Sequence, residues 1–120
     1  MNMSSTYLIA ELKQQKKKLE KALEEIKKQK IKIDQEYFSF KKEEDKIYEE
    51  IRQCRDTYQF DKLQMRLNVI AARRKSIEQK RLEIEKKIRG YENEIEKIKQ
   101  RINYLKPRGN SGLSMENQVS

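Results

Sequence analysis

The side chains that most often do chemistry in proteins are nearly absent from this 120-residue sequence. It contains no histidine, and its single cysteine, Cys54, has no second thiol with which to pair or to share a metal ion. Zinc sites and histidine-based proton transfer therefore lack their ligands and their base, and no glycine-rich phosphate-binding loop is present. The sequence predicts no catalytic residue, no metal ligand and no cofactor-binding residue, so we expect that the protein is not an enzyme.

Charge is the feature that the sequence offers in place of catalytic groups. Charged side chains make up 41% of the residues, and the net charge is +9. The surplus is uneven: residues 11–33 carry nine Lys against four Glu, residues 34–61 carry five basic against nine acidic residues, and residues 62–108 carry fifteen against six. Such a basic surface attracts acidic partners, although many of these charges are also expected simply to solvate a thin helix.

The elements that position these charges follow from a seven-residue repeat. Hydrophobic side chains are only 35% of the total, too few for a globular core, so they must be buried as stripes. One series of d positions runs through Leu12, Leu19, Ile26, Ile33, Phe40, Ile47 and Cys54, and a second runs through Leu63, Ile70, Ile77, Ile84, Tyr91, Ile98 and Leu105. The a positions of the two series begin at Ile9 and Phe60. Heptads sustained this long predict coiled-coil helices.

The two series are out of phase with each other. The first register would place its next a residue at Met65, whereas the second requires Leu67, and this slip of two residues fits neither of the usual coiled-coil insertions. The sequence therefore predicts an all-α fold, a long two-helix antiparallel coiled-coil hairpin. Its arms are residues 7–54 and 60–106, its turn is residues 55–59, and Asp61 is expected to cap the second helix. A parallel dimer of one continuous helix is the alternative.

The predicted hairpin is flanked by polar segments. Residues 1–6 are expected to form a flexible leader, and residues 107–120 a disordered C-terminal tail, because Pro107 cannot continue a helix and glycines follow it. One unpaired thiol is typical of a reducing compartment, and no apolar run is long enough for a signal peptide or a membrane span. We therefore expect a soluble, intracellular protein that does not insert into a membrane.

Eight residues are candidates for partner binding. Four are cations outside the a and d positions, two are aromatic residues outside both series, and two are aromatic residues at the turn, where exposed anchors commonly supply binding energy: Lys13, Lys17, Lys97, Arg101, Phe38, Tyr48, Tyr58 and Phe60. In the alternative interpretation, Phe60 closes the first layer of the seam and Tyr58 shields it.

Polar side chains also interrupt the a series, namely Lys16, Lys30, Glu44, Arg74 and Arg81. Polar residues at a positions lower the stability of a coiled coil but fix its register. The alternative is that the seam is loose, with long side chains reaching solvent and a partner supplying a third surface.

In its length, basic charge and paired heptad arms, the chain resembles the FliJ/YscO-type central stalk proteins of type III secretion. The resemblance covers residues 7–106 and lies in the architecture, while the turn lacks the Gly or Pro that would mark its tip. It implies a cytoplasmic, virulence-related protein-transport factor, held at the cytoplasmic face of the inner membrane through a secretion complex. The end carrying both termini would enter the hexameric export ATPase, and the opposite end would contact the export gate protein. Secretion chaperones are further partners that the resemblance implies.

Two other functions remain open. The chain could be a prefoldin-like cochaperone or scaffold, which a helical hairpin would suit equally well. It could also bind nucleic acid through basic clusters such as residues 16–18, 27–28 and 73–75. Because these clusters are interleaved with Glu and match no nucleic-acid-binding motif, nucleic acid is the weaker expectation.

Overall fold

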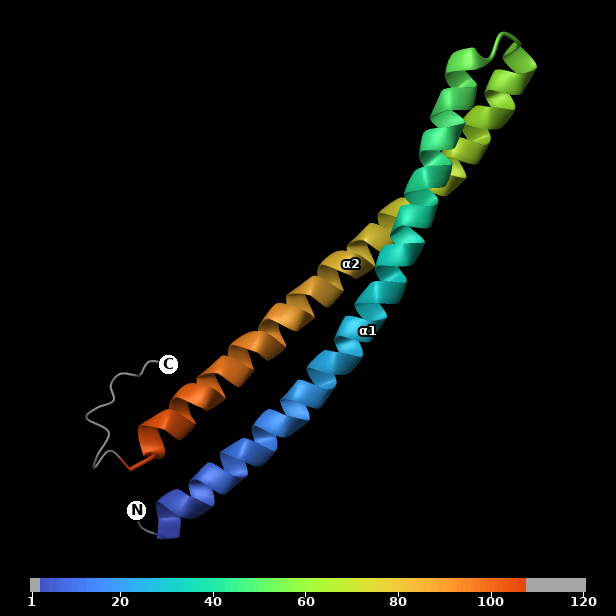
Figure 1. Cartoon of the computed structure of the whole chain (residues 1–120). Coiled ribbons are helices and arrows are strands. Elements are labelled where there is room, and N and C mark those ends of the chain that lie inside the picture. The colour runs from blue at the N-terminus through green and yellow to red at the C-terminus, as the bar shows by residue number, and fades with distance from the viewer. Residues whose placement is uncertain (1–2, 108–120) are drawn as a thin grey trace. The chain divides into compact units, whose positions relative to one another are not determined.

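The computed structural model describes residues 3–107 and consists of two long helices. Helix α1 spans Met3–Gln53, helix α2 spans Thr57–Leu105, and residues 54–56 connect them (Figure 1). No strand occurs among the described residues. The predicted all-α hairpin is therefore confirmed, and the alternative of one continuous helix is wrong because the chain breaks between Gln53 and Thr57 and folds back on itself.

The hairpin divides into two compact units, in each of which α1 and α2 pack against each other. Among the described residues, the terminal unit contains residues 3–23 and 90–107, and the loop unit contains residues 24–89. In the terminal unit, the core is a cluster of buried isoleucines with three half-buried leucines packed against it: Ile9, Ile98, Ile102, Leu12, Leu19 and Leu105. All six are a or d residues of the predicted heptads, and the start of α1 meets the end of α2, as antiparallel packing requires.

The loop unit has a second core built from the same heptad positions. Ile47 is completely buried, and it forms a cluster with Leu63, Leu67 and Ile70. Phe40, Ile51 and Cys54 pack against this cluster and remain half-buried. Burying one such Ile or Leu side chain contributes about 1.5–3 kcal/mol before the cost of ordering it. The heptad stripe therefore supplies the hydrophobic stabilisation that joins the two helices next to the loop.

The loop is shorter than predicted, and the residue that caps the N-terminus of α2 differs from the predicted one. Helix α2 begins at Thr57, and the carboxylate of Asp56 accepts a hydrogen bond of 3.2 Å from the backbone N–H of Gln59. This is the side-chain bond of a helix N-cap, so Asp56 caps α2 and the prediction for Asp61 is wrong. No described residue has a positive φ angle, which explains why the chain turns here without glycine.

The outer ends of the helices also differ slightly from the predicted boundaries. Helix α1 begins at Met3, inside the expected leader, and α2 ends at Leu105. The backbone N–H of Lys106 still donates to the carbonyl oxygen of Ile102 at 3.1 Å, and Pro107 then ends the helical pattern. The predicted tail beyond residue 107 lies outside the described residues. Neither α1 nor α2 combines the length and the apolar character needed to cross a membrane.

Candidate functional site

The candidate site is the surface of the terminal unit, which has two chemically different flanks. In a coiled coil the a and d residues form the seam, and the e and g residues lie on opposite sides of it. Lys13 and Lys17 fall at e and b of α1, whereas Lys97 and Arg101 fall at c and g of α2. On the sequence alone, these four cations form one set of candidates for partner binding. The structure instead places them in pairs on opposite flanks of the seam.

One flank, which we call the lysine flank, is a shallow depression along the e side of the seam. Five of its eight residues are lysines and one is a glutamate: Lys13, Lys16, Lys17, Glu20, Lys99, Ile102, Asn103 and Lys106. Within residues 3–107, none of these lysines forms an ion pair with a carboxylate. Uncompensated like charges on one flank produce a positive potential, which favours an acidic partner there.

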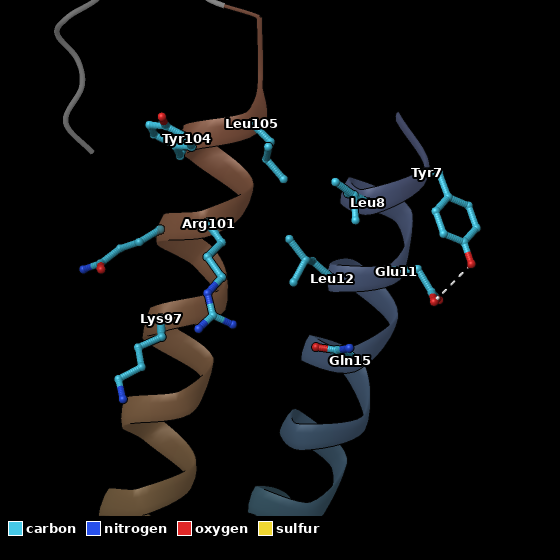
Figure 2. A pocket seen from close by; sticks show the side chains of 10 residues that line it. Tyr7, Leu8, Glu11, Leu12, Gln15, Lys97, Arg101, Tyr104 and Leu105 are labelled. Atoms are coloured by element: carbon cyan, nitrogen blue, oxygen red, sulfur yellow. Dashed lines mark hydrogen bonds between the residues drawn. The ribbon is translucent and has the colours of Figure 1, made fainter. Parts of the chain in front are cut away.

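The other flank, which we call the apolar groove, is an open groove of about 750 Å³ between α1 and α2. Its ten residues are Tyr7, Leu8, Glu11, Leu12, Gln15, Lys97, Gln100, Arg101, Tyr104 and Leu105. Figure 2 shows Leu8 and Leu12 of α1 facing Leu105 and Arg101 of α2 across the groove. Leu8 keeps 46% of its surface exposed, so this flank presents apolar surface to solvent.

Tyr7 forms the outer edge of the groove on α1. Its hydroxyl donates a hydrogen bond of 3.4 Å to Oε2 of Glu11, and both side chains turn away from the centre of the groove (Figure 2). The only carboxylate of the groove lining therefore lies on the α1 wall and points away from its centre. The two cations on the opposite wall, Lys97 and Arg101, have no ion-pair partner within residues 3–107.

The polar a residues of the loop unit, unlike Lys16 of the terminal unit, are paired. Asp34 accepts a hydrogen bond of 2.7 Å from Lys30 and one of 2.9 Å from Arg81 on the other helix. The bond from Lys30, followed by the bond from Arg81, holds the pKa of the Asp34 carboxyl below its ordinary value even though burial opposes this. Lys30 also lies 3.9 Å from Glu85 of α2, so one polar layer links the two helices.

A second polar layer surrounds a buried carboxylate. Glu44 is only 2% exposed and accepts two hydrogen bonds from Arg74 of α2, at 2.9 and 3.2 Å. Arg74 also donates to Glu78 at 3.0 Å, and Lys41 lies 3.6 Å from Glu44. The hydrogen bond to Glu44 raises the pKa of the Arg74 guanidinium further above its already high value. This pairing supports the interpretation that polar a residues fix the register.

Both aromatic candidates on α1 are exposed. Phe38 is 59% exposed and Tyr48 is 44% exposed. Phe38 packs edge to face against Tyr37, with ring centres 5.2 Å apart, and the Arg81 guanidinium lies 4.1 Å from the centre of the Tyr37 ring. Phe38 therefore has a local packing role in an arginine–aromatic cluster, whereas Tyr48 makes no ring contact of this kind with residues 3–107.

The aromatic candidates beside the loop do not belong to the buried seam. Tyr58 is 68% exposed and Phe60 is 42% exposed, and the ammonium group of Lys62 lies 5.1 Å from the centre of the Tyr58 ring. The first buried residue of α2 is Leu63, at 7% exposure. The interpretation in which Phe60 closes the seam is therefore not favoured, and both rings remain accessible to a partner.

The two units of the structure carry similar net positive charges. The described residues of the terminal unit carry nine Lys or Arg against five Glu, and the loop unit carries nineteen against fourteen Asp or Glu. The surplus is similar in the two units, so the contrast seen between sequence segments does not coincide with them. The terminal unit is distinguished by the concentration of lysines on one flank. The signal in the sequence is the full heptad register, in which four of these lysines fall at e or b positions, on one side of the seam.

Residues 3–107 contain no group of three or more His, Cys, Asp or Glu side chains that could hold a metal ion. Comparison with protein-family models gave no matching family, comparison with curated proteins gave no matching relative, and comparison with solved structures gave no matching fold.

Proposed function

We propose that this chain is a non-enzymatic helical adaptor, and specifically the central stalk of a type III secretion export ATPase. The terminal unit binds inside the hexameric ring, and residues beside the loop contact the export gate protein or secretion chaperones. The proposal is supported by the resemblance in architecture to the FliJ/YscO-type stalk proteins and by the hairpin fold itself.

The observation that carries the proposal is the lysine flank. Its five lysines lie on both helices of the hairpin and have no carboxylate partner among the described residues. A preformed cluster of like charges raises the association rate with an oppositely charged surface and orients the encounter, more than it adds to the affinity. An acidic lining of a ring pore is the partner surface that this cluster would fit.

The loop unit supplies the second half of the proposal. Tyr58 and Phe60 are exposed beside the loop, and exposed aromatic side chains are frequent anchors at protein interfaces. Replacing both by Ser is expected to impair binding of the export gate protein while leaving ATPase binding unchanged. Circular dichroism and thermal melting of the variant provide the control, because loss of helicity would assign the rings a structural role instead.

Titration of a purified hexameric export ATPase with the full chain tests the proposal directly. The chain should form a complex with the hexamer, and the rate of ATP hydrolysis should rise with the fraction of hexamer bound. No detectable complex at moderate salt with ATPases from several secretion systems would rule out the stalk assignment.

Nucleic-acid binding is the second candidate, because the lysine flank would also fit a row of phosphates. Binding of this kind weakens steeply with salt, since each neutralised phosphate releases a counterion. Fluorescence anisotropy with duplex DNA and with RNA at physiological salt distinguishes the two candidates. Tight, salt-sensitive binding there would favour nucleic acid over the adaptor.

A further inference from the structure

We infer that the apolar groove of the terminal unit is a docking site for a short amphipathic helix of a partner protein whose apolar face is bordered by acidic residues. This inference goes beyond the proposed function, because the groove lies on the flank opposite to the lysines and requires no export ATPase. Four of its residues are on the inner walls in Figure 2: Leu8, Leu12, Arg101 and Leu105.

The shape of the groove fits a helix. Its lining runs from residue 7 to residue 15 of α1 and from residue 97 to residue 105 of α2. This length corresponds to about 12 Å of helix axis, or roughly two turns. Two helices packed side by side leave a groove into which the residues of a third helix can insert at i, i+3 or i+4, and i+7 spacing. A docked helix would thereby complete a three-helix bundle over this unit.

Because the groove is lined by exposed and half-buried leucines, it would bind the apolar face of the partner helix. Leu8 is 46% exposed, and Leu12 and Leu105 are only half-buried although they belong to the seam. Burial of apolar surface is the main driving force of such association. A stripe of leucine or isoleucine residues on the partner would cover these three side chains, each of which the hairpin leaves partly exposed.

The positive charges of the groove predict which residues border the apolar face of the partner helix. A helix lying over the groove would cover Arg101, and this guanidinium has no carboxylate partner within residues 3–107. Desolvating an unpaired cation is costly unless the partner supplies the opposite charge. Lys97 lies one turn away on the same wall, while Glu11 is on the other wall and points away from the centre of the groove. The groove therefore selects for acidic residues next to α2.

The probe for this inference is a fluorescein-labelled synthetic peptide of about 16 residues, long enough to form a helix on binding. Its leucines are spaced for one helical face, and glutamates border that face. A second peptide carries Lys in place of every Glu, and a third carries Ser in place of every Leu. With the full chain, anisotropy should show binding of the first peptide and at least about tenfold weaker binding of the other two, since both contacts contribute to the selection.

Variants of the chain test whether the peptide binds in the groove. Leu8→Asp should weaken binding of the acidic peptide by about tenfold or more, and Arg101→Ser, which leaves Lys97 in place, should reduce the preference for Glu over Lys. Lys99→Ser is the matched control, because it removes one positive charge from the same helix on the opposite flank, and it should change the affinity by less than about twofold. Circular dichroism checks that each variant stays helical.

Three results would overturn the inference. Equal binding of the acidic and basic peptides would remove the charge argument, and an equal loss of affinity in Lys99→Ser would show attraction by overall charge alone. A stable dimer of the wild-type chain in sedimentation equilibrium, dissociated by Leu8→Asp, would show that a second copy of this chain occupies the groove. None of these results bears on binding to an export ATPase, so the two proposals fail separately.

Discussion

The Arg74 guanidinium of α2 holds the buried carboxylate of Glu44 of α1 through two hydrogen bonds of 2.9 and 3.2 Å. Both residues are at a positions, where a coiled coil ordinarily places apolar side chains. The pair lies between residues that are 30 positions apart in the sequence, so it forms only when the helices are paired in this register.

Removing the Arg74 side chain should therefore destabilise the folded hairpin. Arg74→Ala leaves the Glu44 carboxylate, 2% exposed, without its main partner. We expect the free energy of unfolding to fall by at least about 2 kcal/mol, since an uncompensated buried charge is strongly destabilising. Replacing both residues by Leu should restore the stability or exceed it. Urea unfolding followed by circular dichroism measures both effects, with the exposed neighbour variant Arg73→Ala as control. A loss no larger than the control's would contradict the account of this pair.

The Asp34 layer predicts a dependence of stability on pH. The hydrogen bonds from Lys30 and Arg81 lower the pKa of Asp34 from its ordinary value of 3.8. A carboxyl whose pKa is lower in the folded state stabilises the fold above its unfolded-state pKa, and this contribution is lost as pH falls through the folded-state pKa.

The wild type should thus lose its stability advantage over Asp34→Asn as the solution becomes acidic. We expect the difference in free energy of unfolding to be constant from about pH 7 to about pH 5 and to shrink between about pH 4 and pH 2. Urea unfolding of both proteins at each pH measures this difference, in which the other carboxyls cancel. A difference that stays constant down to the lowest pH would show that these hydrogen bonds do not favour the ionised carboxylate.

The N-cap of α2 can be tested by comparing two aspartates. The Asp56 carboxylate accepts a hydrogen bond from the backbone N–H of Gln59, so Asp56→Ala should lower the free energy of unfolding by about 1 kcal/mol. Asp61→Ala removes an exposed aspartate of the same helix, within its second turn, and should change stability by less than about 0.5 kcal/mol. If the Asp61 variant lost as much stability as the Asp56 variant, the capping assignment would be incorrect.

Most of the fold could be predicted from the sequence, because the heptad stripe is a periodic signal that long helices preserve. The residues of both cores, including Ile9, Ile47 and Ile98, occupy predicted a and d positions. The loop was less predictable. Asp56 and Asp61 are both suitable capping residues, and the choice between them depends on backbone geometry and not on residue type.

The candidate site could be predicted only in part. The a and d positions mark Glu44 and Arg74 as polar seam residues, but they do not show that the two side chains pair, because long side chains meet partners up to a turn away. On the a and d positions alone, Lys13 and Lys17 also fall into one group with Lys97 and Arg101. Separating them requires the full heptad register, because e and b positions lie on one side of the seam and g and c positions on the other.

The association rate of the chain with a hexameric export ATPase, measured after charge reversal on the lysine flank, tests whether this flank meets the ATPase. Lys13→Glu with Lys17→Glu is compared with Lys42→Glu and Lys46→Glu, exposed lysines of the loop unit with the same spacing on α1. We expect the flank variant to associate at least about tenfold more slowly and to stimulate ATP hydrolysis less, with the control close to wild type. Equal slowing of both variants, or of neither, would contradict the claim that the lysine flank is the surface that meets the ATPase.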